Sequence, residues 1–269
     1  MALNDYEYSY RGLTFGGATN YGVVSEEGIL DTDTRVSDRP FPRKPGALSG
    51  IHLAEPKTIQ IVIEVIGTMA SSALAGRIED VMDAFNAYYY DVPSEDYDQL
   101  NFKYPGFVEQ FIRCRPVKRS LVGGRTFVSE LGIRQIAVQL NAYDPRRYAV
   151  GTTDSGVVTG TFNVTNAGDI YTYPRVVFTL DASGNATLVN NTTGLSLVIV
   201  GATASASLTA NMGRAIRGDI VNKIIHEGST DKYTKWQLPR APWGLAPGVN
   251  SLTLSVGTNV EVFSHGAWS

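Results

Sequence analysis

Histidine and cysteine are the side chains most often used for general acid–base catalysis, metal binding and nucleophilic attack, and this sequence has few of them. His52, His226 and His265 lie far apart, and none is followed two to four residues later by a second histidine or cysteine. The single cysteine, Cys114, lies in the strand-like run Phe111-Ile-Arg-Cys-Arg, where we expect a buried structural thiol and not a nucleophile. The sequence therefore indicates neither a zinc site nor a catalytic dyad.

Glycine motifs with a chemical role are also missing. The run Gly12-Leu-Thr-Phe-Gly-Gly17 lacks the Lys and Ser/Thr of a phosphate-binding loop, and no G-x-S-x-G run marks a hydrolase nucleophile. Paired carboxylates for glycoside cleavage have no fixed spacing in sequence because the fold sets their separation, so that class stays open at this stage. We expect a protein that is not an enzyme and that uses no metal and no cofactor.

Charge is distributed unevenly along the chain. Residues 1–147 hold 16 Lys/Arg and 19 Asp/Glu, whereas residues 148–269 hold 7 of each. The change falls at Asn141-Ala-Tyr-Asp-Pro-Arg-Arg-Tyr148, where Pro145 stops a strand because it has no N–H to donate to a sheet ladder. The sequence therefore predicts two domains, 1–147 and 148–269, and each is long enough to bury its own core.

The composition excludes several classes of protein. The net charge of −3 and the pI of about 5.7 do not fit a dedicated nucleic-acid binder. No apolar stretch approaches the roughly 20 residues that span a bilayer. The start, Met1-Ala-Leu-Asn-Asp-Tyr-Glu-Tyr, lacks the basic and apolar regions of a signal peptide, so we expect assembly in reducing cytosol, no membrane insertion and no general export.

The first domain is predicted to be mostly strand. Tyr6, Tyr8 and Tyr10 alternate with polar residues, and a hairpin continues through Leu13 and Phe15. The run 58–66 is so apolar at its centre that we expect both faces to be covered. Further strands are expected at 100–104, 106–115 and 133–140, and residues 31–50 are interpreted as a long loop or flexible arm.

One segment of the first domain has helical periodicity. Leu74, Ile78, Val81 and Phe85 recur at steps of three and four residues between Ser72 and Tyr89. This spacing is typical of a packing stripe, so it predicts a single helix against the strands. The first domain is therefore of the α+β type within a mainly β protein.

The second domain shows short β runs separated by Gly, Asn or Asp, a pattern typical of a sandwich. We expect strands at 157–163, 175–180, 186–190, 195–200, 206–210, 219–225 and 252–256. Trp236 and Trp243 flank a proline-containing loop, where large rings either plug the end of a sandwich or face outward.

The order of these parts resembles the distal tail proteins of long-tailed, siphovirus-type phages. In the first domain the resemblance rests on Tyr8-Ser-Tyr-Arg-Gly-Leu, the Pro/Arg-rich arm, the strand at 58–66, the helix from Ala73 and Asn141-Ala-Tyr-Asp-Pro. In the second domain it rests on Phe162-Asn-Val-Thr-Asn-Ala-Gly168 and Trp243-Gly-Leu-Ala-Pro-Gly-Val-Asn250. The similarity spans nearly the whole chain through the order and spacing of short motifs.

The resemblance implies an architecture and a set of partners. The first domain would be a tail-tube-like β-sandwich or barrel with one flanking helix that forms a homohexameric ring, and the second a galectin-like jelly-roll sandwich that projects outward. The ring would join the tail tube to the tail-tip hub and the receptor-binding or side proteins. It would give passage to the tape-measure protein and then to DNA, which a slightly acidic channel would not bind specifically. The protein would belong to the virion, at the tail tip.

Contact residues are predicted on both domains. The arm supplies the subunit-interface candidates, Arg35, Arg39, Phe41, Arg43 and Lys44. Trp236 and Trp243 are the candidates for contact with carbohydrate or a partner protein. Two alternatives stay open: a carbohydrate-binding module for host cell-wall glycans, although no His-x-Asn-x-Arg run of true galectins occurs in 148–269, and a tail-tube subunit that polymerises into long tubes.

Overall fold

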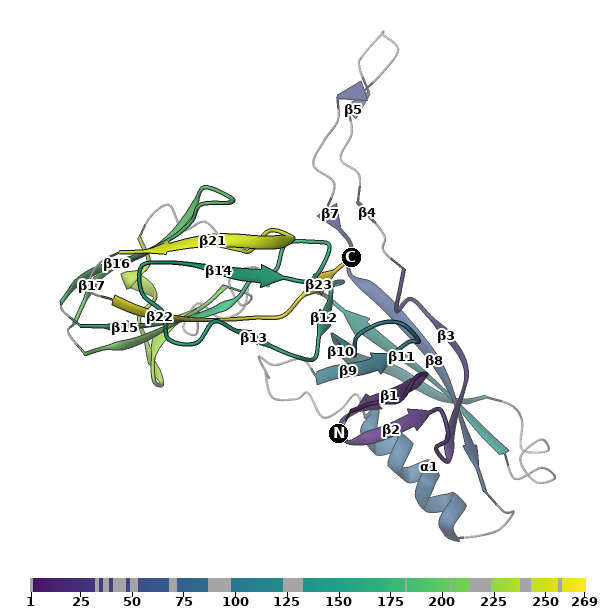
Figure 1. Ribbon diagram of the computed structural model, residues 1–269. Helices are drawn as coiled ribbons and strands as arrows, with labels where there is room; N and C mark the ends of the chain where they lie inside the picture. Colours follow the sequence, from purple (N-terminus) through teal and green to yellow (C-terminus); the bar gives the residue numbers. More distant parts are fainter. Residues whose placement is uncertain are drawn as a thin grey trace. The chain divides into compact units, whose positions relative to one another are not determined.

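The computed structural model describes residues 2–31, 34–35, 39–40, 47–48, 53–67, 72–86, 98–122, 133–181, 183–203, 205–212, 224–237, 243–255 and 258–269. By its internal contacts the chain forms two compact units, Met1–Arg147 and Tyr148–Ser269, whose strands are drawn in Figure 1. Each unit has its own buried apolar core. Both units are mainly β, and the α-helix α1 belongs to the first, so the predicted fold class is confirmed.

The N-terminal unit contains one large antiparallel sheet with the strand order β2-β1-β9-β10-β11-β8-β3 (Figure 1). Its strands are β1 (Glu7–Tyr10), β2 (Leu13–Gly16), β3 (Tyr21–Glu27), β8 (Lys57–Ile66), β9 (Asp98–Lys103), β10 (Gln110–Val122) and β11 (Ile133–Ala142). The strand β10 runs past its expected end. Pro116 has no N–H to donate, and the pairing of β10 with β11 shifts its register between Pro116 and Lys118, so that the strand continues beyond the proline.

The strand β8 shows how the core forms. Ile59, Ile61 and Ile63 are fully buried, whereas Thr58 and Gln60 are exposed on the other face. The expectation that both faces are covered was therefore wrong for the single chain. The polar residues between the isoleucines place the strand in a sheet with one buried and one open face.

The helix α1 (Ser72–Ala84) packs beside β2 and β8 (Figure 1). Its buried side chains are Leu74, Val81 and Ala84, and Phe85 is buried just after the helix ends. The helix confirms the predicted packing stripe but stops earlier than the periodicity suggests; Tyr89 lies outside the described residues.

The segment interpreted as a loop or arm, residues 31–50, contains strands that pair with one another or with residues just after it. β4 (Thr34–Arg35) pairs with β7 (Leu53–Ala54), and β5 (Arg39–Pro40) pairs with β6 (Ala47–Leu48). Both pairings are antiparallel, and the second is nested inside the first. The described parts of this segment therefore form a two-stranded ribbon instead of an irregular loop.

The C-terminal unit is a sandwich of two antiparallel sheets. One has the order β13-β22-β15-β18-β19-β20 and the other β14-β21-β16-β17 (Figure 1). Their bounds are β13 (Thr153–Asp154), β14 (Thr161–Asn166), β15 (Arg175–Leu180), β16 (Gly184–Asn190), β17 (Leu195–Ala202), β18 (Ser207–Asn211), β19 (Ile225–Glu227), β20 (Thr230–Asp231), β21 (Gly248–Leu254) and β22 (Thr258–Ser264). Shorter elements are β12 (Arg147–Ala149), the 3₁₀ helix η3 (Tyr233–Lys235) and β23 (Ala267–Trp268). The core between the sheets includes Phe178 and Leu188, and β22 is a strand that the sequence analysis missed.

Candidate functional site

The residues capable of chemistry have structural roles where the structure describes them. His226 Nδ1 lies 2.8 Å from the carbonyl oxygen of Gly228, and His265 Nδ1 lies 2.8 Å from that of Ala149. Cys114 is buried in β10 as predicted, and burial raises the pKa of its thiol above the ordinary value. His52 lies outside the described residues. Within the described ranges, no cluster of three or more His, Cys, Asp or Glu side chains is placed to hold a metal ion, and no helix is long and apolar enough to cross a membrane.

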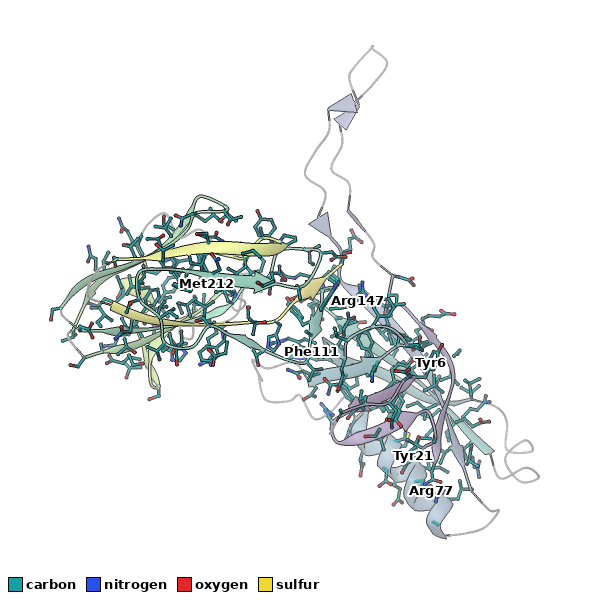
Figure 2. All side chains as sticks on the ribbon, viewed as in Figure 1. Tyr6, Tyr21, Arg77, Phe111, Arg147 and Met212 are labelled. Atoms are coloured by element: carbon teal, nitrogen blue, oxygen red, sulfur yellow. The ribbon has the colours of Figure 1, made fainter. Side chains whose placement is uncertain are left out.

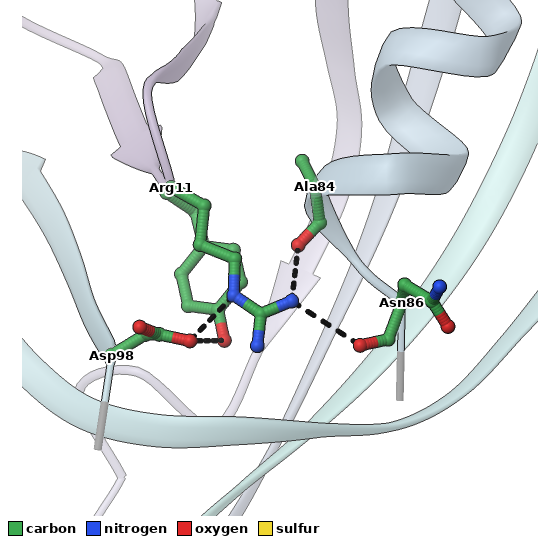
Figure 3. A network of polar contacts seen from close by, with 5 residues as sticks. Arg11, Ala84, Asn86 and Asp98 are labelled. Carbon is green, nitrogen blue, oxygen red and sulfur yellow. Dashed lines mark hydrogen bonds and ion pairs between the residues drawn. The ribbon is translucent and has the colours of Figure 1, made fainter. Parts of the chain in front are cut away.

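One polar network fixes the end of α1 (Figure 3). The Nη1 atom of Arg11 donates to the carbonyl oxygens of Ala84 and Asn86, each at 3.2 Å, and its Nε lies 2.5 Å from the Asp98 carboxylate. The hydroxyl of Tyr10 also donates to Asp98, at 3.4 Å. The last carbonyls of a helix lack partners within the helix and carry partial negative charge, so a cation stabilises them. Arg11 therefore joins the β1–β2 hairpin, α1 and β9.

A second network joins β3 to β1 and to the end of β9. The hydroxyls of Tyr8 and Tyr104 both donate to the Glu26 carboxylate. Burial, and then the hydrogen bond to Glu26, raises the pKa of each phenol above its ordinary value. No pattern in the sequence predicts this contact, since alternation assigns each residue to a face but does not pair distant strands.

The predicted subunit-interface residues lie on the ribbon or beyond the described chain. Arg35 is in β4, opposite Leu53, and Arg39 is in β5, opposite Leu48. Phe41, Arg43 and Lys44 lie outside the described residues. The structure thus supplies a backbone register for the first two, and the predicted subunit contact stays a prediction.

The two tryptophan candidates are in the core of the C-terminal unit. Trp243 is fully buried, and its Nε1 donates to the carbonyl oxygen of Leu195 at 3.2 Å. Trp236 is 4% exposed and packs edge-on against Tyr233. A sugar ring has no access to either indole in this arrangement, because stacking on carbohydrate requires an open ring face.

Buried asparagines that the sequence analysis did not identify hold the loop after Trp243. Asn250 Oδ1 accepts from the backbone N–H of Ala246 at 2.9 Å and from Asn190 Nδ2 at 3.0 Å. Asn250 Nδ2 donates to the carbonyl oxygens of Ala246 and Gly248, at 2.8 and 3.1 Å. The resembling motif Trp243–Asn250 is therefore a packed and hydrogen-bonded loop and has no free polar group at Asn250.

No protein-family model matches the sequence, and no curated protein matches it. Solved structures do match. The SPP1 Dit protein, described as a paradigm of the hub adsorption apparatus in phages that infect Gram-positive bacteria, is 15% identical over 96% of this chain and 97% of its own, with a TM-score of 0.66. A chain of the phage P2 baseplate, in its activated conformation with Ca, is 7% identical over the same shares, with a TM-score of 0.51. The resemblance to the distal tail proteins thus holds for the architecture of nearly the whole chain, which has the fold of SPP1 Dit.

Proposed function

We propose that this chain is a structural virion protein that forms the ring at the distal end of a phage tail. The observation that carries the proposal is the match to SPP1 Dit, which covers 96% of the chain and so includes both units. The match to a phage baseplate chain points the same way. At these identities the support comes from the order and geometry of the parts and not from shared site residues.

In this proposal the N-terminal unit is the tail-tube-like part that closes a homohexameric ring, a number taken from the resemblance. Open sheet edges support self-association because unpaired backbone N–H and C=O groups readily pair with another chain. The ribbon with Arg35 and Arg39 is the segment proposed to reach a neighbouring subunit.

The C-terminal unit is proposed to be galectin-like and to project outward. Its two-sheet sandwich agrees with that class of fold. The ring would connect the tail-tube protein to the tail-tip hub and to the receptor-binding or side proteins, while the tape-measure protein and DNA pass through its channel. The net charge of −3 is consistent with passage of DNA without specific binding. Function would then come from geometry and not from catalysis.

Assembly of the full-length protein tests this function. We expect light scattering to give the mass of a closed ring and negative-stain microscopy to show rings of one size, alone or after the tail-tip hub partner is added. Long tubes would identify a tail-tube subunit instead. A protein that stays monomeric with its partners and binds cell-wall glycans would be a carbohydrate-binding module, and either result overturns the proposal.

A further inference from the structure

An exposed apolar surface lies on two neighbouring segments of the N-terminal unit, residues 2–7 and 103–109, and we call it the Tyr6 patch. The side chains of Tyr6, Phe107 and Val108 are 58%, 53% and 57% exposed (Tyr6 is labelled in Figure 2). The Tyr6 N–H donates to the carbonyl oxygen of Lys103 at 2.7 Å. The ring of Tyr6 stands edge-on to that of Tyr104, with centroids 6.3 Å apart. Large apolar side chains that are exposed to solvent on adjoining segments indicate a contact surface.

The backbone at Tyr6 is strained. Its φ of 62° lies in the left-handed region, which a tyrosine rarely adopts. The surroundings hold it there, because the Glu7 carboxylate accepts from the backbone N–H of Asn4 at 2.8 Å and from its Nδ2 at 3.0 Å. On the other side, a Cβ added to Gly16 would lie only 2.3 Å from the Tyr6 carbonyl oxygen. The exposed ring is therefore presented by a constrained turn.

The Tyr6 patch is acidic. Its accessible carboxylates are those of Asp5 and Glu109, against one cation, Lys103, whereas the third carboxylate of the two segments, Glu7, is 9% exposed and is held by Asn4. Lys103 Nζ lies 3.6 Å from Asp5, whose side chain is 52% exposed. Glu109 is near the other segment, where its Oε2 accepts from the Leu3 N–H at 3.3 Å. A binding partner for this surface should combine positive charge with flat apolar groups.

The chain itself contains a segment with that chemistry. Residues 34–54 carry four cations, Arg35, Arg39, Arg43 and Lys44, against one carboxylate, Asp38, and they also include Phe41 and the prolines at 40, 42 and 45. Proline rings stack on aromatic side chains, and arginine both stacks on rings and pairs with carboxylates. The charges and the apolar groups of the segment therefore complement those of the Tyr6 patch.

We propose that the Tyr6 patch receives the proline- and arginine-rich segment 34–54 of a second copy of this chain. The inference rests on the proposed ring, in which every copy offers one segment and one patch. Such a contact is head-to-tail, because two different surfaces meet, and head-to-tail contacts generate a ring where the rotation between successive copies closes. The Tyr6 patch of one subunit would thus be the surface that binds the ribbon of the next subunit in the ring.

Photo-crosslinking of the full-length protein tests the contact directly. A benzophenone amino acid replaces Phe107, and labelled and unlabelled copies are mixed so that cross-links between chains can be recognised by mass. We expect intermolecular cross-links to fall within residues 34–54. Cross-links between chains that fall elsewhere, or cross-links confined to one chain, overturn the proposal.

Substitutions give a second test. Tyr6→Gly removes the ring and suits a positive φ, so the turn should persist, and Phe107→Ser removes the neighbouring ring. Each should weaken self-association at least about tenfold. The control Tyr143→Ser removes a side chain that is 60% exposed outside the patch and should leave assembly unchanged.

The outcomes separate the two proposals. If rings of both variants form as readily as those of the unmodified protein, the docking surface is wrong while the ring function stands. If the unmodified protein forms no ring even with its tail partners, the ring function fails, and the docking proposal fails with it.

Discussion

The hydroxyl of Tyr8 on β1 donates to the Glu26 carboxylate on β3, although these strands lie near opposite ends of the strand order. Tyr104, just after β9, donates to the same carboxylate. Tyr8 also stacks on Phe15 of β2, with ring centroids 5.4 Å apart. The sheet therefore bends back on itself around an aromatic core, and one acidic side chain holds its ends together.

Replacing Glu26 should loosen this closure. Glu26→Gln keeps the shape but replaces two charge-assisted hydrogen bonds with weaker ones, so we expect a loss of about 1–3 kcal/mol in the free energy of unfolding. Urea unfolding followed by circular dichroism measures it. The three tryptophans, Trp236, Trp243 and Trp268, all lie in the C-terminal unit, so their fluorescence gives an internal reference that should not change. Glu27→Gln, at an exposed position, is the matched control; equal effects of the two substitutions would contradict the role of Glu26.

Alkaline pH should destabilise the N-terminal unit. The pKa values of Tyr8 and Tyr104 are raised in the folded chain, and the pKa of Tyr21 is raised to about 12, first by burial and then by its hydrogen bond to Asp80. A raised pKa means that the unfolded chain loses these protons first. Stability is therefore complete below about pH 10 and falls as the pH rises toward and beyond 12.

Phenolate absorbance during an alkaline titration measures this effect. We expect part of the tyrosine signal to appear only together with loss of the circular dichroism signal. Tyr8→Phe should remove part of that cooperative step. Smooth titration of every tyrosine while the fold stays intact would be evidence against the buried phenols.

Arg11 should contribute more to the stability of the N-terminal unit than its position in a turn suggests. Its φ of 46° is unfavourable for arginine, and the structure compensates with bonds to the end of α1 and to Asp98. Arg11→Met keeps the apolar stem and leaves the carbonyl of Ala84 at the end of α1, the carbonyl of Asn86 just beyond it and the Asp98 carboxylate without this partner. We expect a loss of about 1–3 kcal/mol in urea unfolding.

The control for Arg11 is another arginine that binds a backbone carbonyl. Arg77 Nη1 donates to the Ile66 carbonyl oxygen at 2.6 Å, but that bond is exposed to solvent. Arg77→Met should therefore change stability by less than about 1 kcal/mol. If Arg77→Met has as large an effect as Arg11→Met, burial of the network is not what makes Arg11 important.

Local patterns predicted the elements that depend on local spacing. The isoleucines of β8 and the stripe of α1 can be identified from sequence because the period of each element appears in adjacent residues. The strand β22 was missed because its alternation is short: Val260 and Val262 are buried, but the outward Glu261 is followed on the same face by the apolar Phe263, whose ring packs against Arg175, with the guanidinium carbon 4.1 Å from the ring centroid. Apolar residues on both faces obscure the alternation.

The site residues were predicted less well because their partners are distant in sequence. Arg11 and Asp98 are 87 residues apart, and Asn190 and Asn250 are 60 apart. Considered by itself, each of these residues would be predicted to lie in a turn or loop. Only the pairing of the strands shows which distant residue it binds. The tryptophans could be recognised as large rings near a loop, but whether such a ring faces the core or the solvent depends on the packing of both sheets.

Asn250 should be essential for the loop after Trp243. Asn250→Asp puts a carboxylate oxygen where the amide donates to the carbonyl oxygens of Ala246 and Gly248, so attraction becomes repulsion. We expect a loss of about 1–3 kcal/mol in the stability of the C-terminal unit, measured by tryptophan fluorescence in urea. Asn163→Asp, at an exposed position of β14, should have little effect. Faster hydrogen exchange at the Ala246 amide of the Asn250 variant would locate the change; unchanged exchange would argue against it.

Trp243 tests whether the indole acts as a contact surface or as part of the core. Because it is fully buried, Trp243→Ala should cost about 3–5 kcal/mol in unfolding of the C-terminal unit. Trp243→Phe keeps most of the ring and loses the bond to the Leu195 carbonyl, so it should cost less, about 1–3 kcal/mol. Tyr171→Ala, at a position 44% exposed, should change stability by less than about 1 kcal/mol. Urea unfolding followed by circular dichroism ranks the three variants. If Trp243→Ala were as stable as the unmodified protein, the indole would have to be exposed in solution, and a role in binding sugar or a partner would again fit. If the expected ranking holds, any binding that Trp243→Ala loses reflects loss of the fold.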